Sequence, residues 1–122
     1  MTIINYLERL DARLDEMSGI IISSSILRDV DVHLGTGLLK GRIVFLDGST
    51  LDFVEQLPVS RARFRFHYMD AENNLVARWD SAPHHRQLDT FPYHLHTPRG
   101  VEGHQAVTLL EVLEKVEDLV SV

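Results

Sequence analysis

The chain has 122 residues, a formal net charge of −6 and no cysteine, which excludes disulfides and thiolate metal sites and argues against non-specific nucleic-acid binding. Residues 1–17 lack the basic start and continuous apolar run of a signal peptide, and no stretch is long and apolar enough to span a bilayer. With 44% hydrophobic and 25% charged residues, we expect one soluble, cytoplasmic domain covering residues 1–122.

The first predicted element is an amphipathic helix. Thr2 can cap its start and Gly19 can end it. Its apolar residues recur at alternating steps of four and three, which places them on one stripe: Ile3, Leu7, Leu10, Leu14 and Met17. We expect this stripe to face the core.

Strands follow. The β-prone stretch that starts at Ile20 continues into alternating apolar and polar residues, which predicts a half-buried strand through Val32 and Leu34 with a turn at 35–37. The next two strands flank Asp47-Gly48. A loop of odd length, residues 47–49, would pair Phe45 with Leu51 and so bring the two apolar faces together.

A second hairpin is predicted from residues 61–69 and 75–80, with a four-residue turn at 71–74. This loop length places Phe66 opposite Trp79, so that the apolar faces of the two strands agree. The same register pairs His67 with Arg78 and Arg65 with Asp80. The other face of the hairpin then carries a polar set: Arg63, Arg65, His67, Arg78 and Asp80.

A second helix is predicted at the C-terminal end, where Thr108 and Glu111 have the spacing of a capping box. Its apolar stripe consists of Leu109, Val112, Leu113, Val116 and Leu119. We therefore expect an α+β fold with about five antiparallel strands, an irregular loop rich in histidine and proline at 81–100, and both helices on one face of the sheet.

The loop at 81–100 carries four of the seven histidines, His84, His85, His94 and His96, and three of the four prolines. Residues 58–100 hold six basic and four acidic side chains, whereas the segments before and after them each have a net charge of −4. This middle segment is an electropositive island between acidic ends, and we expect an anionic substrate to bind there.

These residue types suit metal-free acid–base chemistry on a phosphodiester. Histidines can donate and accept protons near neutral pH, arginine can bind phosphate, and aspartate can orient an imidazole. We therefore predict a metal-independent ribonuclease site without a cofactor. Its catalytic candidates are His67, Arg78, Asp80, His84, His85, His94 and His96, and Arg63 and Arg65 are its candidates for substrate binding.

Other interpretations of the loop remain open. A metal-dependent hydrolase could use the same segment: His94 and His96 would point the same way on an extended backbone, whereas the neighbours His84 and His85 would point apart. Some of the histidines could instead be structural, with Phe91 and Tyr93 as apolar anchors of the loop. The protein could also be a binding module without enzymatic activity.

The motifs in this segment resemble the TumE-type toxins of prokaryotic toxin–antitoxin modules. The resemblance rests on His67-Tyr68, on Arg78 and Asp80, on Ala82 through His85, and on Phe91-Pro92 followed by His94 and His96. Length, the leading helix, the strand pairs and the closing helix fit as well. Trp79 and Ser81 depart from the pattern, since tyrosine and asparagine are expected there.

The resemblance implies a growth-inhibiting toxin held in check by a cognate antitoxin, which often has a helix-turn-helix domain. The ribonuclease mechanism and an RNA substrate are predictions from the side chains instead. Homodimerisation is left open, and no membrane contact is expected.

Overall fold

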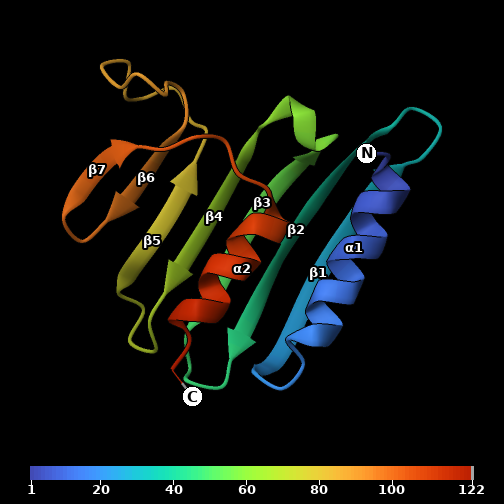
Figure 1. Ribbon diagram of the computed structural model, residues 1–122, viewed down its shortest axis with the longest axis horizontal. Coiled ribbons are helices and arrows are strands. Elements are labelled where there is room, and N and C mark those ends of the chain that lie inside the picture. The colour runs from blue at the N-terminus through green and yellow to red at the C-terminus, as the bar shows by residue number, and fades with distance from the viewer. Residues whose placement is uncertain (122) are drawn as a thin grey trace.

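The computed structural model describes residues 1–121, which form two helices and a seven-stranded antiparallel sheet. The strands follow one another in space in the order of the chain, so that each pairs with the next (Figure 1). The elements are α1 (Ile3–Glu16), β1 (Ile21–Asp31), β2 (Thr36–Phe45), β3 (Thr50–Leu57), the 3₁₀ turn η1 (Val59–Arg61), β4 (Phe64–Met69), β5 (Leu75–Asp80), β6 (His94–Thr97), β7 (Gly100–Gly103) and α2 (Leu109–Leu119).

The strand count corrects the prediction of about five strands. The two additional strands, β6 and β7, lie at the end of the segment predicted as an irregular loop, and only residues 81–93 remain without regular structure. The Pro98-Arg99 turn between them lets this short hairpin form, and pairing with β5 stabilises it. A four-residue strand is too short to give a clear alternation signal in the sequence.

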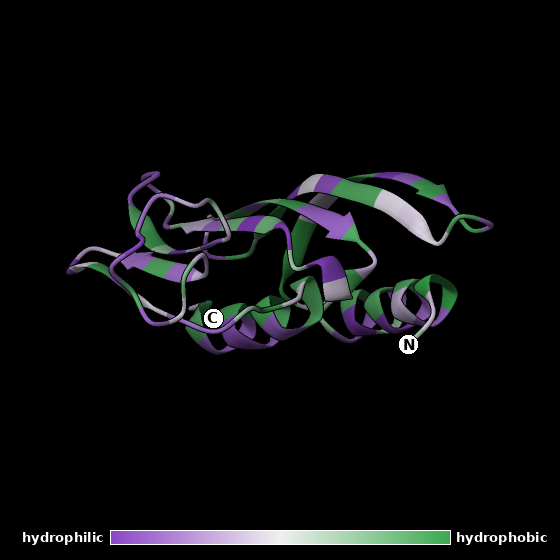
Figure 2. Ribbon diagram, turned by 90° about the horizontal axis from the view of Figure 1, so that it is seen from above, coloured by the Kyte–Doolittle hydropathy of each residue, from purple (hydrophilic) through white to green (hydrophobic). Residues whose placement is uncertain are grey.

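Both helices cover the same face of the sheet, as predicted (Figures 1 and 2). Their apolar stripes meet the apolar side chains of the strands in one core, whose largest fully buried members include Leu10, Leu39, Phe45, Phe53, Phe66, Tyr68 and Leu113. No helix formed by the described residues covers the opposite face of the sheet, which is called the open face below. Within residues 1–121 neither helix has the length and apolar character needed to cross a bilayer.

The predicted helix caps are largely confirmed. The Thr2 hydroxyl accepts a hydrogen bond at the start of α1, and Thr108 forms the predicted capping box with Glu111. α1 ends at Glu16 and not at Gly19, because the chain already leaves helical geometry at Met17. At the end of α2 the prediction for Leu119 is wrong. Leu119 is exposed, since the chain becomes extended after it and turns Val120 into the core instead.

The register of the hairpin β4–β5 is the predicted one over four pairs: Arg65 with Asp80, Phe66 with Trp79, His67 with Arg78 and Tyr68 with Ala77. Next to the turn it shifts by one residue, so that Met69 pairs with Leu75. The hairpin β2–β3 has the predicted odd loop, but its register differs, because Ile43 and not Phe45 pairs with Leu51. Its loop is residues 46–48, one position earlier than predicted. Gly48 takes the positive φ of 82° that the last residue of such a loop requires.

The first hairpin also turns earlier than predicted, at residues 32–35. Asp31 closes this turn by accepting a hydrogen bond from the backbone N–H of Leu34. As a result Val32 and Leu34 lie exposed in the turn and are not part of a half-buried strand.

One carboxylate, that of Glu55 on β3, lies inside the core with only 2% of the residue exposed. It accepts hydrogen bonds from the Tyr6 hydroxyl (2.6 Å) and from the backbone N–H of Leu109 (3.0 Å), and so connects α1, the sheet and the first turn of α2. Burial disfavours the charged form and raises the pKa of Glu55 to about 7, although both hydrogen bonds act in the opposite direction.

Candidate functional site on the open face

Two rows of side chains cross the open face of the sheet, and the strand register fixes their order. The first row runs from β2 to β6 through Arg42, Asp52, His67, Arg78 and His96. The second row lies beside it and runs through Lys40, Val54, Arg65, Asp80 and His94. Side chains that are far apart in the sequence are therefore neighbours on one surface, because all of them have the same strand parity.

Three imidazoles meet at the β6 end of these rows. His94 and His96 project from β6, and His85 approaches them from the irregular segment 81–93. The ring centroids are 4.7 Å apart for His85 and His94, 5.6 Å for His85 and His96, and 4.8 Å for His94 and His96. These three residues are called the histidine cluster below. One ring nitrogen from each lies within 4.8 Å of those of the other two.

His84 lies outside the cluster, on an exposed part of the segment. Its neighbour His85 contacts the rings on β6, so His85 belongs to the cluster and His84 does not. The prediction placed all four of these histidines on an irregular loop, and the structure differs from it. His94 and His96 belong to the sheet itself, and among the four loop histidines only His85 joins them from irregular structure.

His94 is the buried member of the cluster, with 2% of the residue exposed. Its Nδ1 lies 2.9 Å from the carbonyl oxygen of Pro92, and this geometry requires that Nδ1 carries the proton and donates it. The hydrogen bond fixes the tautomer and orientation of the ring, which leaves Nε2 as the atom available for chemistry or for a ligand.

Arg78 lies between two histidines of the first row, His67 on β4 and His96 on β6. Its Nε is buried without a hydrogen bond among residues 1–121, and the nearest carboxylate oxygen, Asp80 Oδ2, is 4.0 Å away. The charge of the guanidinium is therefore only weakly neutralised by the protein, and the group can bind an anion next to the histidine cluster.

The surroundings keep two imidazoles neutral. Burial lowers the pKa of His96, and Arg78 and the other two members of the cluster lower it further. Burial also lowers the pKa of His67, with Arg78 and Arg65 acting in the same direction. Both rings are therefore in the neutral form at neutral pH. A neutral imidazole can accept a proton or bind a metal ion.

Asp80, one of the catalytic candidates, makes a hydrogen bond to the backbone. Its Oδ1 accepts a hydrogen bond of 2.8 Å from the backbone N–H of Ala82, and no histidine within residues 1–121 donates to it. Asp80 therefore holds the start of the segment that carries His85 and does not orient a ring directly. The ring of His94 is oriented instead by the carbonyl oxygen of Pro92.

Ser81 is one of the two departures from the TumE pattern, and its hydrogen bonds show what the serine does. Its hydroxyl accepts a hydrogen bond from the backbone N–H of Phe64 (2.9 Å) and donates one to the carbonyl oxygen of the same residue (3.1 Å). The side chain joins the ends of β4 and β5 and is not part of the histidine cluster. An asparagine amide also has one acceptor and one donor group, so it could make the same pair of bonds. Trp79, the other departure, lies on the core face.

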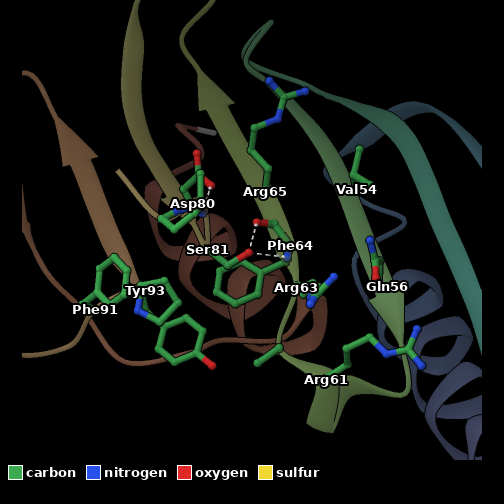
Figure 3. Close-up of a pocket in the computed structure, with 14 residues that line it drawn as sticks. Val54, Gln56, Arg61, Arg63, Phe64, Arg65, Asp80, Ser81, Phe91 and Tyr93 are labelled. Atoms are coloured by element: carbon green, nitrogen blue, oxygen red, sulfur yellow. Dashed lines mark hydrogen bonds between the residues drawn. The ribbon is translucent and has the colours of Figure 1, made fainter. Parts of the chain in front are cut away.

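A groove with a volume of about 790 Å³ opens beside the site (Figure 3). Arg63 and Arg65, the two residues predicted to bind substrate, line it together with Asp80. The groove could not be predicted from the sequence, because four separate segments form its walls. The sequence had indicated Phe91 and Tyr93 only as anchors of the loop, but both of them line the groove as well.

Fold and site together describe an α+β protein in which a helix-backed antiparallel sheet presents clustered imidazoles and an arginine on its open face. The family model described as toxin TumE matches residues 10–121 of the chain. The chain therefore belongs to the TumE toxin family, as the motifs indicated, and a toxin of this kind implies an antitoxin partner. No curated protein and no solved structure matches the chain significantly.

Proposed function

We propose that this toxin cleaves RNA, and that the histidine cluster and Arg78 carry out the reaction without a metal ion. The observation that supports the proposal is the convergence of three imidazoles beside a weakly neutralised guanidinium on one surface. Cleavage by internal transesterification needs a base for the 2′-hydroxyl proton, an acid for the leaving oxygen and a cation for the phosphate.

The residues can be assigned to these tasks. His96 is neutral at pH 7 and adjoins Arg78, so it suits the base that takes the 2′-hydroxyl proton. His94 is too deeply buried to reach a substrate freely, and it positions its neighbours. His85, which is half-buried on the irregular segment, is left as the acid that protonates the leaving oxygen. Arg78 then neutralises the charge on the phosphate.

The test uses purified protein without a histidine tag, incubated with total RNA in EDTA. We expect the wild-type protein to degrade RNA, and His85→Ala, His96→Ala and Arg78→Ala to abolish the degradation while circular dichroism shows an intact fold. His84→Ala is the matched control, because His84 is exposed, outside the cluster and adjacent in sequence. Intact RNA with the wild-type protein, or equal activity in all variants, would contradict the proposal.

The same geometry favours a second candidate, a metal-dependent hydrolase. Nitrogen atoms of three histidines lie within 4.8 Å of one another, and the Pro92 carbonyl orients His94 in the way that metal-binding histidines are commonly oriented. Three imidazoles and an open position would suit Zn²⁺. Elemental analysis of the tag-free protein separates the two candidates: stoichiometric metal, with activity lost in chelator and restored by that metal, would favour the hydrolase.

The biological role has its own test. The toxin is expressed from a tightly controlled promoter, with and without the neighbouring reading frame. We expect growth arrest that the neighbour relieves, and Arg78→Ala to remove the arrest. The family implies an antitoxin partner, and the sequence of the gene that relieves the arrest would identify it and show whether it has a helix-turn-helix domain. Unhindered growth in both cases would count against the toxin role.

A further inference from the structure

The groove beside the histidine cluster is built from the same segments that carry the cluster. Residues 80–83 form part of its wall and lead directly into His84 and His85, and residues 91–93 form another part and lead into His94. Its volume of about 790 Å³ lies in the range of sites that hold small organic ligands. Whatever occupies the groove therefore lies next to the cluster.

The charge of the groove selects an anionic occupant. Arg61, Arg63 and Arg65 all line it, all three are exposed, and within residues 1–121 none of them forms an ion pair with a carboxylate. Among residues 1–121, Asp80 is the one acidic residue in the lining, and one of its oxygens accepts a hydrogen bond from the backbone N–H of Ala82. Three unpaired guanidinium groups on a chain of net charge −6 form a local site for phosphate groups.

The opposite side of the groove is aromatic (Figure 3). The ring of Phe64 stacks on the ring of Tyr93, with centroids 6.0 Å apart and planes 12° from parallel, and on its other neighbour Phe66 at 5.1 Å and 13°. This series of parallel rings begins in the core and ends at the half-buried Tyr93. Phe91 adds an exposed ring, with the guanidinium of Arg86 5.8 Å from its centroid. Such a platform can receive one more planar ring.

We propose that the groove is a nucleotide subsite for single-stranded RNA, in which a base stacks on Phe91 and Tyr93 and the adjacent phosphates bind Arg63 and Arg65. The inference rests on the proposed ribonuclease function and names its substrate class. Aromatic surfaces opposite basic side chains are the usual means of holding single strands, because every base has a face to stack and every linkage a charge. Bases in a duplex are already stacked on one another and do not present that face.

The test measures the fluorescence anisotropy of a short, labelled, single-stranded RNA of mixed sequence, titrated with the His85→Ala protein so that cleavage does not interfere. We expect Phe91→Ala and Arg63→Ala, each added to this background, to weaken binding about tenfold or more. Arg63→Ala is also expected to lower the slope of log Kd against log salt concentration by about 0.7. Arg99→Ala is the matched control, since Arg99 is an exposed arginine in the β6–β7 turn outside the groove.

Other outcomes would overturn the subsite. Affinity unchanged in Phe91→Ala and Arg63→Ala, an equal loss in Arg99→Ala, or a duplex of the same sequence bound as tightly as the single strand would each do so. Failure of the subsite and failure of the proposed function are distinguishable. If binding depends on the groove but the wild-type protein does not cleave RNA, only the proposed ribonuclease function is contradicted. If the groove variants bind and cleave RNA as the wild-type protein does, only the proposed subsite is contradicted.

Discussion

Replacing Glu55 with glutamine is expected to change the pH dependence of stability. Glutamine has nearly the same shape, can still accept a hydrogen bond from Tyr6 or Leu109, and cannot ionise. The ordinary pKa of this carboxyl is 4.5, and burial raises it to about 7 in the folded protein. Between these two pH values the unfolded chain has released a proton that the folded protein still holds, so the wild-type protein loses stability as the pH rises.

The size of this loss follows from the two pKa values. The difference between 4.5 and about 7 corresponds to about 3.4 kcal/mol in the free energy of unfolding, of which about 2.5 kcal/mol falls between about pH 5 and about pH 8. The substitution also removes one of two hydrogen bonds to the side chain, which costs about 1 kcal/mol at either pH. The variant should therefore be close to the wild type in stability near pH 5 and clearly more stable near pH 8.

Urea unfolding at both pH values measures the effect as a difference between Glu55→Gln and the wild type, so that other titrating groups cancel. The control is Glu114→Gln on the exposed side of α2, which makes the same chemical change outside the core. A stability difference for Glu55→Gln that stays constant from pH 5 to pH 8 would show that the buried carboxyl does not hold its proton near neutrality, and the argument from burial would then be wrong.

Two further predictions concern the sheet. Ser81→Ala removes the two hydrogen bonds that the side chain makes to the backbone of Phe64 and leaves the one from the Ser81 N–H to the Phe64 carbonyl oxygen. It should lower the free energy of unfolding by about 1–3 kcal/mol, because the Phe64 N–H loses its partner, whereas Ser81→Asn should retain stability and toxicity. Chemical denaturation and a growth assay measure the two effects. A toxic Ser81→Ala with unchanged stability would argue against the bracing role. Gly41→Ala places a methyl group 2.3 Å from the Ser25 carbonyl oxygen and should lower the free energy of unfolding by more than about 1 kcal/mol. The control is Gly19→Ala, where no atom lies within 4 Å of the added methyl group. Equal melting temperatures of the two variants would contradict this packing.

Alternation along the strands was enough to predict which side chains share a face. The polar residues of β4 and β5 alternate with aromatic ones, and a strand of that pattern has only one way to bury its apolar side. The register of this hairpin, including His67 beside Arg78, could therefore be derived before any coordinates. The β2–β3 hairpin was less well determined. The apolar pattern fixes only whether the loop length is odd or even, and the exact position depended on Gly48 taking a positive φ.

The composition of the histidine cluster could be derived only in part. The spacing of His94 and His96 already implied that both rings point the same way, but not that they extend the sheet, because a strand of four residues obtains its stability from pairing with β5. The position of His85 could not be derived from the alternation of apolar and polar residues, because His85 does not belong to a strand. The groove depends in the same way on how four segments meet, and sequence patterns that describe one element at a time carry no information about their arrangement.

Thr90 ties the irregular segment that carries His85 to the end of the sheet. The Thr90 hydroxyl donates to the carbonyl oxygen of Tyr93 (2.7 Å) and accepts from the backbone N–H of His104 just beyond β7 (3.0 Å). Gly103 allows this approach, since a Cβ there would lie 2.8 Å from the same hydroxyl. Two rings of the cluster are thus held by a strand and the third by a segment fixed at Thr90. A site that must bring three imidazoles together needs this second anchor, because a segment without ladder hydrogen bonds would otherwise leave His85 free to move away.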